Sequence, residues 1–67
     1  MSESLAEAFP KEQARCRELL QAYRDIGPAG MFGAAHIEAV LRAADRAAAS
    51  GDVIAMLQAY EAMQACE

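Results

Sequence analysis

Apolar residues recur at every third or fourth position along most of this chain, an interval that places them on one face of an α-helix. The clearest run is Cys16, Leu19, Leu20 and Tyr23, which stand at i, i+3, i+4 and i+7. Alanine has the highest helix propensity and makes up 17 of the 67 residues, whereas proline occurs only twice. The sequence therefore predicts an all-α fold.

Two glycine-containing breaks divide this pattern into three helical segments. Gly27 suits the position after a helix C-terminus, and Pro28 cannot continue that helix. In the second break, Gly51 can end one helix in the left-handed conformation and Asp52 can cap the next. We predict helices over about residues 10–26, 29 or 31 to 50, and 53–65. Because the second break is short, the second and third helices should form an antiparallel hairpin with the first helix packed across it.

The first nine residues have two interpretations. Ser4 and Glu7 match a capping box, so residues 4–9 could form a short helical turn that docks Leu5 and Phe9 onto the core. The alternative is a flexible tail that precedes a helix whose first turn contains Pro10. In either case, a chain of 67 residues forms at most one domain, residues 1–67.

The second and third helices differ in their apolar faces. The stripe of the second helix consists of Ile37, Val40, Leu41, Ala44 and Ala48. Small residues near its start allow another backbone to approach closely, namely Gly30, Gly33 and Ala34. Apolar positions of the third helix cover about half of its circumference, at Val53, Ile54, Met56, Leu57, Tyr60 and Met63. This surplus, in a chain too short to bury a large core, predicts a homodimer.

The charge of the chain argues against direct nucleic-acid binding. Ten acidic and six basic residues give a net charge of −4, and the last 21 residues carry no basic side chain. Proteins that bind nucleic acids usually present a basic stripe and have a high pI. A weak nucleic-acid-associated regulator remains an alternative, in which two copies pool their arginines, Arg15, Arg17, Arg24, Arg42 and Arg46.

The two cysteines, Cys16 and Cys66, do not form a metal-binding or redox motif in the sequence. Cys16 falls on the apolar stripe of the first helix, and Cys66 lies where we expect the third helix to fray. A disulfide between them is conceivable if their helices pack antiparallel. No signal peptide or membrane-spanning run is visible, so we expect the protein in the reducing cytoplasm of a bacterial host.

No arrangement of residues indicates catalysis, a cofactor or a metal. His36 is the only histidine, and no serine or cysteine nucleophile stands in a recognisable catalytic motif around it. One histidine and two distant cysteines lack the clustered spacing of metal ligands. The glycine-rich stretch 27–33 has no Lys-Ser or Lys-Thr ending, so it is a helix-to-helix corner and not a phosphate loop. We expect no enzymatic activity.

Met31 and Phe32 are the most informative pair for function, since both fall on the side of the second helix opposite its apolar stripe. They either tuck under a neighbouring helix or form an exposed patch, and methionine and aromatic side chains are favoured at interfaces. We predict that the partner-binding residues are Met31, Phe32, His36, Ile54, Met56 and Met63.

Residues 17–63 resemble small helical orphan proteins of proteobacteria and their prophages. The matching features are Tyr23, the corner from Ile26 to Ala34, Ala44-Asp45, Ser50-Gly51-Asp52-Val53, and the series Met56, Tyr60, Met63. The resemblance implies a phage accessory protein that binds and inhibits or modulates a host protein complex, for example as an anti-CRISPR protein or an inhibitor of a regulator. A structural or assembly accessory without inhibitory activity is the alternative.

Overall fold

The computed structural model describes residues 3–67, and within this range it contains three α-helices, one 3-10 turn and no strand. Helix α1 spans Leu5–Ile26, α2 spans Met31–Ser50 and α3 spans Val53–Gln64. The 3-10 turn η1 covers Pro28–Gly30. The all-α prediction and the positions of both breaks are therefore confirmed.

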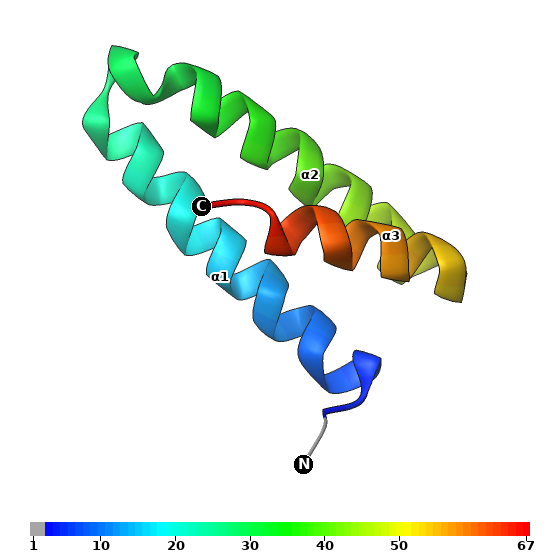
Figure 1. Ribbon diagram of the computed structural model, residues 1–67. Coiled ribbons are helices and arrows are strands. Elements are labelled where there is room, and N and C mark those ends of the chain that lie inside the picture. Colours follow the sequence, from blue (N-terminus) through cyan, green and yellow to red (C-terminus); the bar gives the residue numbers. More distant parts are fainter. Residues whose placement is uncertain (1–2) are drawn as a thin grey trace.

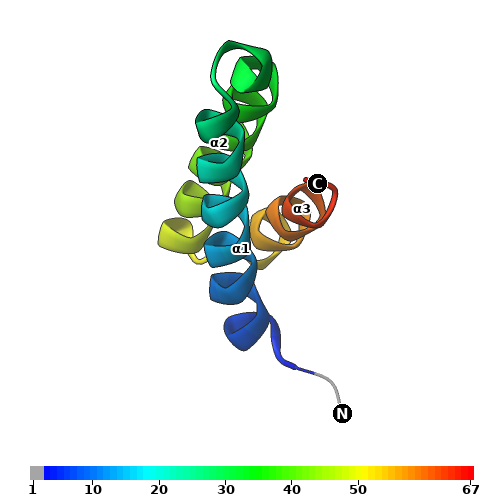
Figure 2. The same ribbon diagram turned by 90° about the vertical axis from the view of Figure 1, so that its left-hand side faces the viewer.

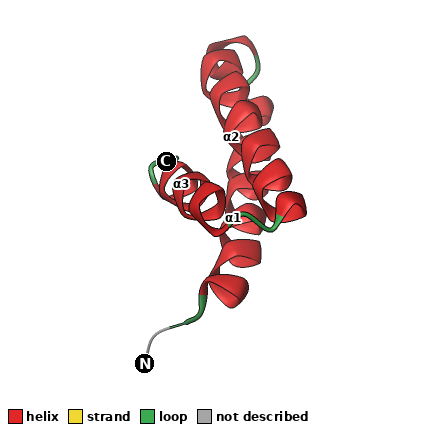
Figure 3. Ribbon diagram, turned by 90° about the vertical axis from the view of Figure 1, so that its right-hand side faces the viewer, coloured by secondary structure: helices red, strands yellow, loops and turns green. Residues whose placement is uncertain are grey.

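The three helices form two layers. Helices α1 and α2 lie side by side, joined at the corner around η1, and α3 turns back from the end of α2 (Figure 1). Helix α3 lies on one side of the α1–α2 pair and contacts both of its members (Figures 2 and 3). The corner extends beyond the part of the pair that α3 covers (Figure 1). No helix within residues 3–67 is long and apolar enough to cross a membrane.

Helix α1 begins at Leu5, so the prediction of a helix that starts near Pro10 was wrong. Ser4 caps the helix through its hydroxyl, which accepts a hydrogen bond from the Glu7 backbone N–H at 3.3 Å. Pro10 lies inside the helix, where it provides no N–H for the carbonyl four residues earlier. Phe9, which is almost completely buried, stabilises this extension because its ring packs into the core. The first two residues of the chain lie outside the described range.

The core is built mostly from small side chains. Its buried members are Phe9, Cys16, Leu20, Ala34, Ile37, Leu41, Ala44, Ala47, Ala59, Met63 and Cys66. The predicted stripe of α2 was wrong at its end, since Ala48 is exposed and Ala47 is buried. The reason is that the last turns of α2 face α3 as well as α1, which rotates the buried side of α2 by about one residue. Because small side chains fill little volume, the helix backbones pack closely.

Tyr23 of α1 packs closely against two glycines, Gly30 at the end of η1 and Gly33 in the first turn of α2. A Cβ atom added at Gly30 would stand 2.1 Å from the Tyr23 backbone oxygen, and one added at Gly33 would stand 2.4 Å from the Tyr23 ring. The corner itself needs Gly27, whose φ of 87° is rarely adopted by residues with a side chain. The prediction of close backbone approach is confirmed at Gly30, whereas Gly33 makes room for the Tyr23 ring and not for a backbone.

The connection between α2 and α3 is ordered by short-range hydrogen bonds. Gly51 ends α2 with a φ of 71°, in the left-handed region. The Asp52 carboxylate then accepts hydrogen bonds from the N–H groups of Ile54 at 3.0 Å and Ala55 at 3.3 Å. Both roles were predicted, and together they set where α3 begins and leave Val53 and Ile54 pointing to solvent.

We expect Gly30→Ala to lower the free energy of unfolding by about 2 kcal/mol or more, because the added methyl group meets backbone that only a shift of α1 relative to α2 can move. Gly51→Ala is the matched control. Its methyl group enters open space, so only the left-handed conformation is penalised, by about 1 kcal/mol. Urea denaturation of both variants measures the difference. Equal losses of stability for the two variants would contradict the close packing at Gly30.

Candidate interaction surfaces

The first candidate surface is the corner patch, which we define as Ile26, Met31 and Phe32. All three side chains are exposed, and Phe32 is 94% accessible to solvent. Their exposure follows from the packing at Tyr23. Because Gly30 and Gly33 press against α1, the neighbouring positions 31 and 32 of α2 point away from it. Of the two interpretations of Met31 and Phe32, the structure supports the exposed patch.

His36 extends the corner patch along α2. It lies one helical turn after Phe32, so the two side chains share a face, and His36 is exposed. An imidazole beside an exposed aromatic ring provides a hydrogen-bond donor or acceptor next to an apolar contact. The corner patch with His36 therefore combines the two elements of a protein-binding surface, an apolar centre and a polar edge.

The second candidate surface is the α3 patch, which we define as Val53, Ile54 and Leu57. Ile54 is 68% exposed, and Val53 and Leu57 are about half exposed. These residues lie on the side of α3 turned away from the core, where Ala59 and Met63 face α1 and α2. Helix α3 thus buries small or flexible side chains and leaves its branched ones in solvent.

Two of the residues predicted for partner binding do not belong to an open surface. Met63 is completely buried in the core, because its position on α3 faces the junction of all three helices. Met56 is half-buried and packs against the same core. The prediction that Met63 binds a partner at the surface was therefore wrong. Met56 can contribute only the part of its side chain that the core leaves exposed.

The corner patch and the α3 patch lie at opposite ends of α2. Met31 begins that helix, and Val53 follows shortly after its end (Figure 1). Val53, Ile54 and Leu57 therefore do not extend the corner patch. Any partner that covers only one end of the molecule meets only one of the two patches.

Two shallow grooves run between the helices. The groove between α2 and α3 has a volume of about 430 Å³ and is lined mainly by alanines, with Arg46, Ser50 and Gln58 at its polar positions. The groove between α1 and α2 has a volume of about 450 Å³ and is lined by charged side chains. In the second groove, Arg17 pairs with Asp45 at 2.9 Å and Arg24 pairs with Glu38 at 2.9 Å. Neither groove is an enclosed cavity that would sequester a small substrate.

These ion pairs bear on nucleic-acid binding. Arg15 and Arg42 also lie near carboxylates, those of Glu12 at 2.9 Å and Glu38 at 3.9 Å. Because a carboxylate beside an arginine neutralises much of its field, Arg15, Arg17, Arg24 and Arg42 contribute less positive potential than unpaired arginines would.

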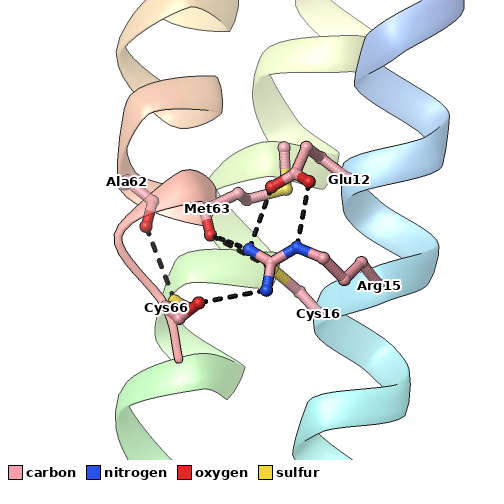
Figure 4. A network of polar contacts seen from close by, with 6 residues as sticks. All are labelled: Glu12, Arg15, Cys16, Ala62, Met63 and Cys66. Carbon is pink, nitrogen blue, oxygen red and sulfur yellow. Dashed lines mark hydrogen bonds and ion pairs between the residues drawn. The ribbon is translucent and has the colours of Figure 1, made fainter.

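Arg15 joins α1 to the C-terminal end of α3. Its guanidinium donates hydrogen bonds to the backbone oxygens of Met63 at 2.6 Å and Cys66 at 3.1 Å (Figure 4). The Glu12 carboxylate accepts two further hydrogen bonds from the same group, and this interaction raises the pKa of Arg15 above its ordinary value. A cation at a helix C-terminus satisfies carbonyls that lack a helical partner and interacts favourably with the helix dipole.

The same network holds Cys66 in place, so the expectation that it frays was wrong. Cys66 is buried although it follows the last residue of α3 by two positions. Tyr23 also contacts this end of the chain, since its hydroxyl donates a hydrogen bond to the Glu67 backbone oxygen at 2.5 Å. Both cysteines are free thiols.

Metal-ligating side chains do not gather in the part of the chain that the structure describes. Within residues 3–67, no cluster of three or more histidine, cysteine, aspartate or glutamate side chains could hold a metal ion. His36 is exposed on α2, whereas Cys16 is buried on α1.

Comparison of the chain with protein-family models, with curated proteins and with solved structures gives no match. The resemblance to prophage orphan proteins therefore stays a prediction.

Sequence reasoning missed Ile26, Val53 and Leu57 as surface residues. Val53 and Leu57 stand at positions typical of a buried helix face, so their exposure depends on which side of α3 meets the core. The role of Arg15 had no sequence signal either, because it joins positions 48 and 51 residues apart.

We expect Arg15→Leu to lower the free energy of unfolding by about 1 kcal/mol, since it removes the hydrogen bonds to two backbone oxygens of the chain end. Solvent limits the loss because the side chain is 41% exposed. Arg17→Leu is the control, because its partner Asp45 is an exposed side chain, and it should cost less than about 0.5 kcal/mol. Thermal unfolding of both variants provides the comparison, and a larger loss for Arg17→Leu would refute the role assigned to Arg15.

Proposed function

We propose that this protein acts by binding another protein through the corner patch, as a phage- or prophage-type module that inhibits or modulates a host protein complex. Surface occupation and not catalysis is the mechanism. The observation that carries this proposal is the exposure of Phe32, an aromatic side chain that is 94% accessible and follows the exposed Met31 in the chain.

The energetic argument concerns what the chain leaves in solvent. Burial of a phenylalanine side chain stabilises a protein by about 1.5–3 kcal/mol, yet this chain exposes Phe32 while alanines occupy several of its core positions. Large apolar side chains at the centre of an interface are typical binding hot spots. A partner with an apolar pocket would gain the free energy of burying Phe32, which folding of this chain does not provide.

The surroundings of Phe32 make it a suitable anchor. The residue lies in the first turn of α2, and this turn is held against α1 by Gly30, Gly33 and Tyr23. An anchor on a rigid element loses less conformational entropy on binding than one on a flexible loop. Met31 beside it has a flexible thioether side chain that adapts to the shape of a partner.

The class of partner follows from the resemblance and from the charge. We propose a host protein complex in the bacterial cytoplasm, such as a CRISPR effector or a transcriptional regulator, as the target. The paired arginines and the net charge of −4 disfavour the alternative of a nucleic-acid-associated regulator.

The α3 patch supports a second contact, which we propose to be a homodimer interface. Val53, Ile54 and Leu57 project from one short helix, and each is about half exposed or more. A two-fold arrangement would pack the α3 patch of one copy, at the turn of the α2–α3 antiparallel hairpin, against the same patch of a second copy. Such a dimer would leave both corner patches free, because they lie at the other end of α2.

We expect Phe32→Ser to weaken partner capture at least tenfold and to change the Tm by less than about 3 °C, because the side chain contributes to binding and not to the core. The measurement is a pull-down from bacterial lysate with tagged protein, together with thermal unfolding. Near-stoichiometric capture of a single complex, whose activity falls on binding, indicates inhibition. Unchanged activity of the captured complex indicates an assembly accessory.

Two controls separate binding from folding in this experiment. Val53→Ser, at the other end of α2, should retain capture. Ile37→Ser should lower both capture and the Tm, since Ile37 is buried in the core. Full capture by Phe32→Ser would exclude the corner patch as the binding surface.

We expect the wild-type protein to sediment at micromolar concentration with twice the mass of one 7.2 kDa chain, and Ile54→Glu to sediment as a folded monomer. The substituted carboxylate would be desolvated in the apolar contact, which opposes association. Ile54→Leu keeps the apolar character and should remain dimeric. A folded wild-type monomer under these conditions would end the dimer hypothesis.

A further inference from the structure

Two cysteines that are 50 residues apart in the sequence contact the same backbone oxygen, Cys16 through its thiol and Cys66 through its backbone N–H. The Cys16 thiol donates a hydrogen bond to the Met63 carbonyl oxygen at 3.6 Å, and the Cys66 backbone N–H donates to the same oxygen at 3.1 Å (Figure 4). Both cysteines are buried, Cys16 completely. Neither the corner patch nor the α3 patch uses them, so the pair is available for a separate role.

The surroundings of the two thiols differ. Cys16 lies in the middle of α1, between helical turns that hold its backbone. Cys66 lies after the end of α3, and its thiol donates a hydrogen bond to the Ala62 oxygen at 3.5 Å. Burial raises the pKa of Cys16, and the neighbouring Cys66 thiol raises it further, whereas the charge of Arg15 lowers it. Cys16 is therefore a protonated thiol at neutral pH, and Cys66 lies on the short non-helical segment that follows α3.

We propose that Cys16 and Cys66 form a reversible intramolecular disulfide that locks the end of α3 onto α1. The oxidant is a low-molecular-weight disulfide. The Cys66 thiolate attacks one sulfur of that disulfide, which forms a mixed disulfide and releases one thiol. Cys16 then loses its proton to solvent and attacks the Cys66 sulfur, which releases the second thiol. Two protein thiols are oxidised and one external disulfide is reduced to two thiols.

The order in which the two thiols react follows from which of them an external disulfide can reach. Cys16 is shielded on all sides by the core, so an external reagent reaches it only if the protein opens. Cys66 becomes accessible when the turn after α3 lifts, which breaks the hydrogen bonds of Arg15 to the Met63 and Cys66 oxygens. Cys66 is thus the attacking thiol, and Cys16 is the resolving thiol.

The disulfide would connect α1 to the segment after α3, which is otherwise held to α1 by the hydrogen bonds of Arg15 and Cys16. It replaces the hydrogen bonds of the two thiols to the Met63 and Ala62 oxygens, since both S–H protons are lost. In return it closes a loop of about 50 residues, which restricts the unfolded chain. We therefore expect the oxidised protein to melt at least about 5 °C above the reduced protein.

The test measures the equilibrium between the wild-type protein and glutathione, reduced and oxidised, in native buffer and again in urea. Alkylation after acid quenching, followed by intact mass measurement, counts the free thiols. Because the native structure holds the cysteines together, the ratio of internal disulfide to dithiol at a given glutathione ratio should be at least about tenfold higher in native buffer. An equal or lower ratio in native buffer would overturn the proposal, as would a product that is only a disulfide-linked dimer.

Single-cysteine variants test the order of attack. Cys16→Ala should accumulate a mixed disulfide with glutathione at Cys66, because the resolving thiol is missing. Cys66→Ala should remain reduced over the same period, because Cys16 is buried. Accumulation of the mixed disulfide in wild-type protein, without the internal bond, would also overturn the proposal. The wild-type equilibrium decides the question even where a variant fails to fold.

Discussion

Tyr23 is the residue on which the arrangement of all three helices depends. Its backbone oxygen lies against Gly30, its ring covers Gly33, and its hydroxyl donates a hydrogen bond to the Glu67 oxygen. Through these contacts one side chain of α1 positions the start of α2 and the end of the segment that follows α3. The same contacts explain the corner patch, because a helix pressed so closely against its neighbour turns its next residues toward solvent.

The share of alanine and cysteine in the interior has consequences for the surface. Small side chains let the helices approach one another, but they bury little apolar area, and the larger residues Phe32, Ile54 and Val53 remain outside. A chain of this size gains limited stability from its core, so hydrogen bonds at helix ends carry more weight than in a larger domain. Arg15 illustrates this point, since it satisfies carbonyls at the end of α3 that helical bonding leaves free.

Some parts of the candidate surfaces could be predicted and others could not. Met31 and Phe32 were identifiable because they fall opposite the apolar stripe of their own helix, which is a local property. Met63 could not be distinguished from Ile54 in this way, because the apolar positions of α3 cover half of its circumference and any part of it could face the core. The start of α1 was misjudged because Pro10 suggested a first turn, whereas the packing of Phe9 outweighs the missing hydrogen bond.

The sequence by itself determined the helical class, the two breaks and the caps at Ser4, Gly51 and Asp52, since each depends on residues within a few positions of one another. Only the tertiary structure decided which face of α3 is buried, that Cys66 is enclosed beside Cys16, and that Arg15 caps the end of α3. These features join residues about 50 positions apart, and no local propensity or spacing encodes a contact of that range. They arise from the way close-packed helices leave room for some side chains and exclude others.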